Sequence, residues 1–208
     1  MKKGLITLSG GIDSVVLAYW LKKVKNYYLN ALIFDYGQRC KKEIECAKVI
    51  ANLLKIPFLV LDISNVFKHL SSFLIQKGTS VIVPNRNMIF LSIAVAFAES
   101  MGVNKVFFAT HKDDELVFLD CRTKFIKKLS EASQLATCQK VSIETPFDNF
   151  TKSVIIKLGY NLGVPFEKTY SCYLGQAKHC GKCLACQERL KAFAKSKLKD
   201  PVAYENSS

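Results

Sequence analysis

The order of apolar and polar positions along the chain predicts an α/β fold. Short, continuous apolar runs of strand length alternate with longer segments in which apolar residues recur at helical spacing. Strands that are apolar on both faces are typical of a parallel sheet with helices on both sides. The predicted strands are residues 3–8, 31–35, 58–62, 106–110 and 141–144, and the predicted helices are residues 14–23, 40–54, 64–77, 87–101, 119–137, 151–162 and 184–195.

Two of these helices are informative about packing. Residues 87–101 are apolar nearly all round, which predicts a central position in the core or at an interface, and Gly102 is expected to end this helix. Residues 40–54 have one apolar side. We expect that side to face the core through Ile44, Ala47, Val49, Ile50, Leu53 and Leu54.

Length and composition favour one substantial core with a small appendage, since the chain has 208 residues and a hydrophobic content of 50%. The pattern becomes short, polar and cysteine-rich after Pro165. We therefore expect a main α/β domain at residues 1–165 and a smaller segment packed on it at residues 166–208. The N-terminal apolar stretch is too short for a secretory signal, and the longest apolar run, residues 88–98, is too short to cross a bilayer. The sequence thus predicts a cytoplasmic protein with no membrane contact.

The chain is basic, with a formal net charge of +13 at pH 7. Such a charge favours phosphate-rich partners, of which nucleic acid is one. However, only four of the 30 basic residues are arginines, and the other 26 are lysines scattered along the chain, which is typical of a solvated surface. A nucleic-acid partner therefore stays open but is not favoured. Arginine is the better ligand for carboxylates and phosphates, so the candidate anion-binding residues are Arg39, Arg86, Arg122 and Arg189.

The stretch LSGGIDSVV, which begins at Leu8, lies between the first predicted strand and the first predicted helix. Backbone N–H groups and the helix dipole make such a helix start an anion site. The glycines let the backbone approach an oxyanion and take positive φ, and the serines offer hydroxyl donors. The aspartate is suited to capping the helix or to holding a metal ion beside phosphates. The expected phosphate-binding residues are Ser9, Gly10, Gly11, Asp13 and Ser14, and the alternative is a glycine turn that only opens a helix.

The loop lacks the Gly-Lys-Thr/Ser ending of the nucleotide-triphosphate P-loop. It instead resembles Ser-Gly-Gly-x-Asp-Ser, the signature of the PP-loop ATP pyrophosphatases. This resemblance implies a Rossmann-like fold of the adenine nucleotide alpha hydrolase type. It also implies that the protein holds ATP by its β- and γ-phosphates, exposes the α-phosphate to attack, and makes adenylates with release of pyrophosphate.

Eight cysteines in such a chain point to metal binding or catalysis before disulfides. Four of them form the pattern Cys-x7-Cys-x2-Cys-x2-Cys, and four thiolates at this spacing are suited to surround one ion tetrahedrally. We expect a structural zinc ion, with an iron–sulfur cluster as the main alternative. His179 is surplus to an all-cysteine site. The expected ligands are Cys172, Cys180, Cys183 and Cys186, whereas Cys40, Cys46, Cys121 and Cys138 are expected to be core or loop thiols.

Further motifs narrow the family. In chain order they are FDYGQR from Phe34, VPNRN from Val83, DCR from Asp120, ETP from Glu144, and SCYLG followed by HCGKCLACQER from Ser171. Together with the phosphate loop, they resemble the 7-cyano-7-deazaguanine synthase family, commonly called QueC, over nearly the whole chain. All four arginines lie inside the matched segments, which favours anion binding by each of them.

The resemblance implies a ligase that activates its substrate twice. ATP adenylates the carboxylate of 7-carboxy-7-deazaguanine, ammonia displaces AMP to give an amide, and a second activation dehydrates the amide to the nitrile preQ0, the queuosine precursor. Adenylation is needed because a carboxylate is a poor electrophile. With free ammonia as the donor, neither a cysteine nucleophile nor a glutaminase domain is required. The implied cofactors are ATP with Mg²⁺ and a structural Zn²⁺, and a homodimer is expected because the family often forms dimers.

The resemblance also implies roles for particular residues. The implied catalytic residues are Asp13, Arg39, Asp120 and Arg122, of which the last two would face the deazaguanine or its carboxylate. The implied ATP-binding residues are Leu8, Ser9, Gly10, Gly11, Asp13, Ser14, Phe34, Tyr36, Gln38, Arg86 and Asn87.

Three departures from the family pattern concern the substrate pocket. The histidine of Gly-Gln-Arg-His is Cys40 here, which removes an imidazole able to bind phosphate or move a proton. The glycine of Val-Pro-Gly-Arg-Asn is Asn85, a residue that tolerates positive φ better than most. The run Ser-Gly-Tyr-Pro before Asp-Cys-Arg is replaced by LVFL at residues 116–119, so the substrate wall is altered.

These departures leave two alternatives open. One is a QueC-like paralogue that stops at the amide, or that joins the activated deazaguanine to another amine or to a protein in phage defence. The other is a PP-loop tRNA-modifying enzyme or an RNA-binding module. The lysine excess supports the second alternative, but no basic stretch interleaved with aromatic residues does.

Overall fold

Five parallel strands form one sheet in the computed structural model of the protein, which is described here for residues 2–75, 78, 80–114 and 117–205. The strand order is β3-β2-β1-β4-β5, and every neighbouring pair is parallel, as the apolar strand pattern predicts. In this register, Ile6 of the central strand lies beside Ala31 on one side and Phe107 on the other. The strands are β1 Lys2–Thr7, β2 Tyr27–Asp35, β3 Phe58–Asp62, β4 Lys105–Phe107 and β5 Ser142–Glu144.

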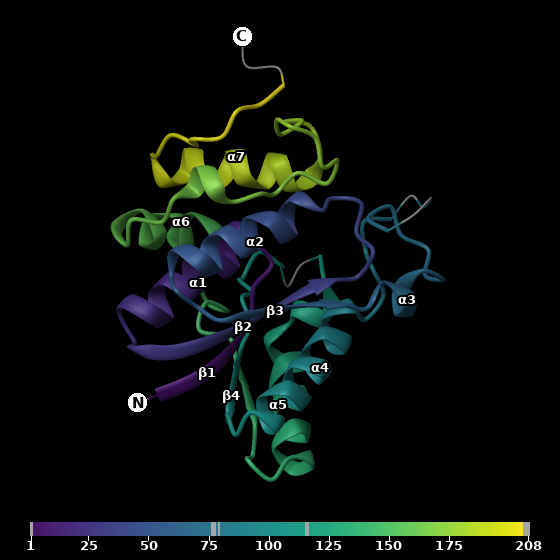
Figure 1. Cartoon of the computed structure of the whole chain (residues 1–208). Coiled ribbons are helices and arrows are strands. Elements are labelled where there is room, and N and C mark those ends of the chain that lie inside the picture. Colours follow the sequence, from purple (N-terminus) through teal and green to yellow (C-terminus); the bar gives the residue numbers. More distant parts are fainter. Residues whose placement is uncertain (1, 76–77, 79, 115–116, 206–208) are drawn as a thin grey trace.

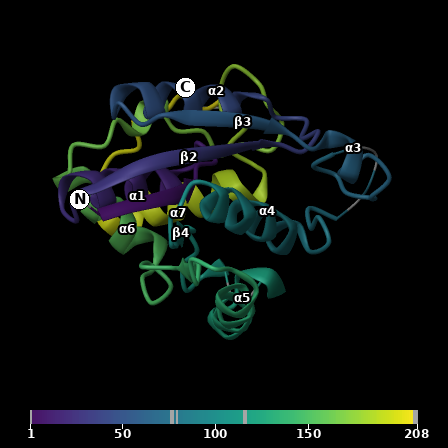
Figure 2. The same ribbon diagram turned by 60° about the horizontal axis from the view of Figure 1, so that its bottom comes forward.

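Helices cover both faces of this sheet (Figure 1). The helices are α1 Ile12–Lys23, α2 Lys42–Leu53, α3 Ser64–Phe67, α4 Arg86–Ser100, α5 Thr123–Ala136, α6 Lys152–Asn161 and α7 Leu184–Ser196. Helices α1, α2, α6 and α7 share one buried apolar cluster, which includes Leu17, Ile50 and Phe193. Helices α4 and α5 contribute to a second cluster on the other face, with Leu91 and Ile126 (Figure 2). None of the helices in the described part of the chain has the length and apolar character needed to span a bilayer.

Two predicted helices are shorter than expected. The helix predicted at residues 64–77 ends at Phe67 after about one turn, and the following backbone forms other hydrogen bonds. The N–H of Phe73 donates to the carbonyl of Ser80 at 2.8 Å, and the N–H of Arg39 donates to the carbonyl of Leu74 at 2.9 Å. Residues 76 and 77 lie outside the described residues. The helix predicted at residues 119–137 begins only at Thr123, because the preceding 3₁₀ turn ends in an extended residue.

The predicted core faces of two helices also need correction. On α2 the buried residues are Ile44, Ala47, Ile50 and Ala51, which follow the spacing of one helical stripe, and Leu54 directly after the helix is buried as well. Val49 and Leu53 lie off this stripe and are 41% and 53% exposed, so their predicted burial is wrong. Helix α4 is not central: it covers one face of the sheet through residues such as Leu91 and Ala94, and Met88 is exposed. Its predicted end is confirmed, since Gly102 follows with a φ of +63°.

Arg189 of α7 is a structural residue. Its side chain is fully buried, with an exposed fraction of 0%. Its Nε and Nη2 donate to the two carboxylate oxygens of Asp200 at 2.8 and 2.9 Å. Nη1 donates to the hydroxyl of Thr169 at 2.9 Å, and Nη2 to the carbonyl of Phe166 at 3.1 Å. The anion that Arg189 binds is therefore the carboxylate of Asp200 in the same chain. The expectation that every arginine binds a ligand is wrong for Arg189.

Replacing Asp200 by Ala is expected to lower the free energy of unfolding by about 3–5 kcal/mol, because it leaves a buried guanidinium without its counter-ion. Urea denaturation measures this change. The matched control is Lys199→Ala at the exposed neighbouring position, which should change the free energy by less than about 0.5 kcal/mol. Equal midpoints for the two variants would contradict the role given to this ion pair.

Candidate active site

A cleft of about 270 Å³ opens at the carboxyl ends of β1, β2 and β4. The sheet order reverses at β1, because β2 and β3 lie on one side of it and β4 and β5 on the other. Ligands of open parallel sheets bind at this point. The C-terminal segment also contributes to the cleft, through Tyr170, Ser171, Tyr173, Ala185 and Glu188.

Most of the residues expected to bind ATP line this cleft. Of the eleven, only Gly10 is absent from its lining; the other ten are Leu8, Ser9, Gly11, Asp13, Ser14, Phe34, Tyr36, Gln38, Arg86 and Asn87. Of the four residues expected to be catalytic, Asp13 lines the cleft, whereas Arg39, Asp120 and Arg122 do not.

These last three residues lie at the edges of neighbouring elements. Arg39 is exposed, and its guanidinium carbon lies 5.0 Å from the centre of the Phe73 ring. Asp120 accepts a hydrogen bond from the backbone N–H of Asn87 at 3.0 Å, so it holds the start of α4. Arg122 is exposed and directly precedes α5.

The phosphate loop owes its shape to Gly10. This residue has a φ of +82°, and a Cβ atom there would collide with the carbonyl oxygen of Glu43 and lie 2.8 Å from the N of Ala47. Only glycine fits, because α2 packs directly against the loop. Gly11 has a φ of −76°, so the expectation of positive φ is wrong for it. Gly11 is also the N-cap residue of α1, which leaves Asp13 inside the first turn and not at the cap.

The two serines fix the loop from within. Ser14 Oγ accepts a hydrogen bond from the N–H of Ser9 at 3.2 Å and donates one to the carbonyl of Gly11 at 3.2 Å. Ser9 Oγ accepts a hydrogen bond from the N–H of Gly11 at 3.3 Å and lies 3.0 Å from Ser14 Oγ. The loop is therefore held in one shape by its own side chains.

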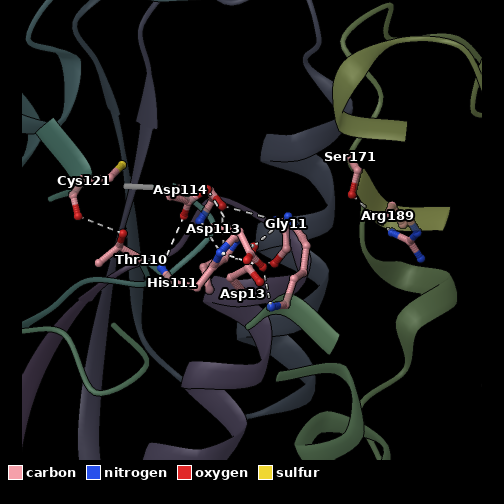
Figure 3. Close-up of polar contacts among 12 residues, drawn as sticks. Gly11, Asp13, Thr110, His111, Asp113, Asp114, Cys121, Ser171 and Arg189 are labelled. Carbon is pink, nitrogen blue, oxygen red and sulfur yellow. Dashed lines mark hydrogen bonds and ion pairs between the residues drawn. The ribbon is translucent and has the colours of Figure 1, made fainter. Parts of the chain in front are cut away.

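A cluster of charged groups gathers at Asp13, beside the loop (Figure 3). Asp13 Oδ2 lies 3.3 Å from Lys152 Nζ and 3.7 Å from His111 Nε2, and the same ring nitrogen lies 3.4 Å from Asp114 Oδ1. Within the described residues, Asp13 Oδ1 and both ring nitrogens of His111 are buried without a hydrogen-bond partner. Among the described residues the cluster is thus only partly satisfied, as expected of a site that binds a charged ligand.

The electrostatics keep the central pair of this cluster ionised. Burial raises the pKa of Asp13, but Lys152 and His111 outweigh it and hold the pKa below its usual value. Burial lowers the pKa of Lys152, but Asp13 and Asp114 outweigh it and hold the pKa above its usual value. Burial and the nearby Asp13 raise the pKa of Asp114.

Arg86 is the one of the four arginines that lines the cleft. Its Nη1 donates to the hydroxyl of Tyr36 at 3.3 Å, and its Nε is buried with no partner among the described residues. Burial lowers the pKa of Arg86, but Tyr36 and Glu43 outweigh it and raise the pKa. Glu43 also lines the cleft; burial raises the pKa of its carboxyl to about 7, against the opposing effect of Arg86.

The three departures from the family pattern have different consequences. Asn85 has a φ of +51°, which confirms that this position requires a residue tolerant of positive φ. Cys40 and Phe118 line the cleft, whereas Val117 and Leu119 are exposed. Leu116 lies outside the described residues. Burial raises the pKa of the Cys40 thiol to about 11, so this thiol is protonated at neutral pH and is no nucleophile.

The four cysteines of the C-terminal motif form one group. Their sulfur atoms all lie within 4.8 Å of one another, and three of the four residues are buried. Backbone N–H groups of Lys182 and Cys183 donate to Cys180 Sγ at 3.4 and 3.3 Å, an arrangement that supports thiolate ligands. His179 is not part of the group, since its Nε2 accepts the N–H of Ser171 at 3.2 Å. The arrangement fits a single ion with four sulfur ligands.

The sequence profile of a family described as queuosine biosynthesis protein QueC matches residues 3–197 of the chain. The chain belongs to the QueC family. It is similar to the 7-cyano-7-deazaguanine synthase of Psychromonas ingrahamii, with 40% identity over 222 residues and 99% of both chains covered. It is also similar to the synthase of Archaeoglobus fulgidus, with 41% identity over 96% of this chain and 89% of that one. The family predicted from the motifs is confirmed, and this QueC protein is an ATP-dependent enzyme of the PP-loop type.

Two solved structures share the fold of this QueC protein. The U34-tRNA thiolase NcsA from Methanococcus maripaludis with its [4Fe-4S] cluster has a TM-score of 0.57 and 17% identity, and the match covers 94% of this chain and 64% of that one. NMN synthetase from Francisella tularensis has a TM-score of 0.57 and 18% identity, with 94% and 77% covered. At these identities the likeness shows the fold alone.

Several residues of the site in this QueC protein were given no role by the sequence analysis. Glu43, Asp114, Lys152, Tyr173 and Glu188 line the cleft, and His111 lies beside Asp13. Tyr173 and Glu188 stand inside the cysteine-rich motif, which predicted metal ligands but not these two cleft residues. One signal was available for His111 and Asp114, because polar residues directly after a predicted parallel strand gather at the ligand-binding edge of the sheet. Lys152 and Glu188 reach the cleft from helices far along the chain, and single-sequence patterns do not show this.

Proposed function

We propose that this QueC protein is a 7-cyano-7-deazaguanine synthase, which converts 7-carboxy-7-deazaguanine, ammonia and ATP by way of the amide into 7-cyano-7-deazaguanine. The observation that carries the proposal is the match to relatives of this name along 96–99% of the chain. A paralogue that stops at the amide and a tRNA-modifying enzyme are not favoured by these relatives.

In the proposed reaction, the loop between β1 and α1 binds the β- and γ-phosphates of ATP as the leaving group. The left-handed Gly10, the start of α1 and the ammonium group of Lys152 support this placement. Lys152 stabilises the charge that develops on pyrophosphate as the bond to the α-phosphorus breaks. Asp13 keeps Lys152 charged and fixed in position.

Asp13 is also suited to hold the Mg²⁺ that the family implies. Its Oδ1 is buried without a partner among the described residues, and Mg²⁺ prefers carboxylate oxygen. When bound there, the ion would neutralise charge on the phosphates. We propose no further ligands from the protein, since magnesium usually keeps several water molecules.

Arg86 is proposed to orient the reacting carboxylate beside the α-phosphate, because a guanidinium donates to two oxygens in one plane. Its buried Nε without a partner and its position in the cleft support this role. Phe34 and Phe90 form a stacked aromatic wall, with ring centres 4.3 Å apart, that suits a planar base.

Asp120 is proposed to be a positioning residue that acts through the N–H of Asn87. Catalytic roles for Arg39 and Arg122 stay predictions.

We propose that the cysteine group binds a structural Zn²⁺, because four sulfur ligands complete a tetrahedral shell and leave no open position. In this arrangement residues 1–165 carry the nucleotide site, and residues 166–208 carry the metal and close one side of the cleft.

A homodimer is part of the proposal. Exposed apolar side chains on and beside the edge strand β3, namely Leu53, Phe58 and Leu59, support it, and light scattering would measure it.

The proposed function is tested by mass spectrometry of the products. Purified protein with ATP, an ammonium salt and 7-carboxy-7-deazaguanine is expected to form the nitrile, with two AMP released for each nitrile because the substrate is activated twice. Omission of ammonia should leave no amide and no nitrile. An amide that is never dehydrated, a covalent adduct on protein, or no product at all would each contradict the proposal.

A further inference from the structure

Glu43 places a carboxyl group in the cleft that neither the motifs nor the family resemblance explains. It lies in the first turn of α2, is half-buried and lines the cleft. No described residue forms a hydrogen bond or an ion pair with its carboxylate. By contrast, the cleft carboxylates Asp13 and Asp114 both lie within 4 Å of a cationic or imidazole side chain. Glu43 is therefore available to a ligand.

The backbone of Glu43 is fixed against the phosphate loop. Its carbonyl oxygen is the atom that a side chain at position 10 would strike, so the loop and the first turn of α2 are in direct contact. Its charge interacts with Arg86 and Tyr36, which line the cleft, and with the thiols of Cys40 and Cys46. Glu43 thus lines the cleft directly beside the proposed phosphate site, with its carboxyl group within electrostatic range of Arg86.

The proposed reaction in this cleft needs a proton acceptor. When ammonia attacks an acyl adenylate, a carbon–nitrogen bond forms, the carbon–oxygen bond to AMP breaks, and one N–H proton must leave to give the neutral amide. A general base is most effective when its pKa lies near the working pH. Burial gives the carboxyl of Glu43 a pKa of about 7, far better matched to this task than that of an exposed carboxylate.

We propose that Glu43 accepts the proton from the nitrogen that attacks the acyl adenylate. The inference rests on the proposed function and adds a catalytic residue to it. The nitrogen lone pair forms the new bond to the carbonyl carbon, the bonding pair of the broken carbon–oxygen bond leaves with AMP, and the proton passes to the Glu43 carboxylate.

Glu43→Gln tests this role, because it keeps the size of the side chain and removes its basicity. The expected result is that acyl-adenylate formation, followed by exchange of labelled pyrophosphate into ATP, stays within about twofold, while the rate of amide formation falls by about 10²–10⁴-fold. Hydroxylamine is a much stronger nucleophile than ammonia, so its attack depends less on a general base and it should still capture the adenylate as a hydroxamate. When the rate is divided by the concentration of free ammonia, which itself rises with pH, the wild-type rate of amide formation should rise with pH through about 7, and the variant should lack this rise.

The matched control is Glu45→Gln on the same helix, which should leave both steps unchanged. Its exposed carboxylate forms an ion pair with Lys48 and does not line the cleft. Normal amide formation by Glu43→Gln would overturn the inference. An equal loss of hydroxamate and amide formation in Glu43→Gln would also overturn it. The same holds if Glu188→Gln, and not Glu43→Gln, selectively lost amide formation. Absence of pyrophosphate exchange in the wild-type enzyme would overturn the proposed function itself, and the role of Glu43 with it.

Discussion

Asp13→Asn is expected to lower the rate of AMP formation by at least about 10³-fold, with the fold intact. The carboxylate of Asp13 is the counter-ion of Lys152, and its buried Oδ1 has no hydrogen-bond partner among the described residues. Without its charge, Lys152 loses the group that fixes it, and the site loses its proposed ligand for Mg²⁺. The measurement is release of pyrophosphate with saturating ATP and acid substrate, alongside circular dichroism of the variant.

A matched control for this loss is Asp148→Asn. Asp148 lies outside the lining of the cleft, and its Oδ1 accepts a hydrogen bond from the side chain of the neighbouring Asn149. This variant should keep the wild-type rate. If Asp13→Asn also turned over at close to the wild-type rate, the assignment of the loop as the site that binds pyrophosphate would be wrong.

Loss of the bound metal is the second large effect that we expect. Metal analysis should find about one zinc ion per chain, and Cys172→Ser should remove most of it. The same segment positions Tyr173 and Glu188 in the cleft, so activity should fall with the zinc content. Structural zinc sites contribute about 10 kcal/mol or more of binding free energy, and loss of only about 5 kcal/mol would lower the Tm by about 10–20 °C.

Cys138→Ser is the control for the metal site, since it removes an exposed thiol away from the cluster and should change neither zinc content nor Tm. A brown, iron-containing protein would show that an iron–sulfur cluster occupies the four thiolates. An unchanged Tm in Cys172→Ser would show that the ion has no structural role.

The fold was predictable from the sequence because its strands are short apolar runs and its helices carry the helical period. The parallel sheet with helices on both faces follows from that alternation. The predictions failed where tertiary contacts decide the outcome. Residues 64–77 have a helical composition, but their backbone forms hydrogen bonds to other segments after Phe67. Val49 is as apolar as Ile50, and only its angle on α2 places it in solvent.

The predictions for the site show the same division. Residues of the phosphate loop and of the Phe34 to Gln38 segment reach the cleft, because they directly follow strands whose carboxyl ends meet. Lys152 and Glu43 lie on helices, and only the packing of α6 and α2 against the loop makes them neighbours of Asp13 and Gly10. Arg189 has the sequence context of a ligand-binding arginine, and only the folded structure shows that its partner is Asp200.

The central claim is that the carboxylate of the substrate attacks the α-phosphorus of ATP. The most direct test uses 7-carboxy-7-deazaguanine with oxygen-18 in both carboxylate oxygens. Our account predicts that each AMP released in either activation carries one oxygen-18 atom in its phosphate group, and that pyrophosphate and the nitrile carry none. Unlabelled AMP, or oxygen-18 in inorganic phosphate, would contradict it.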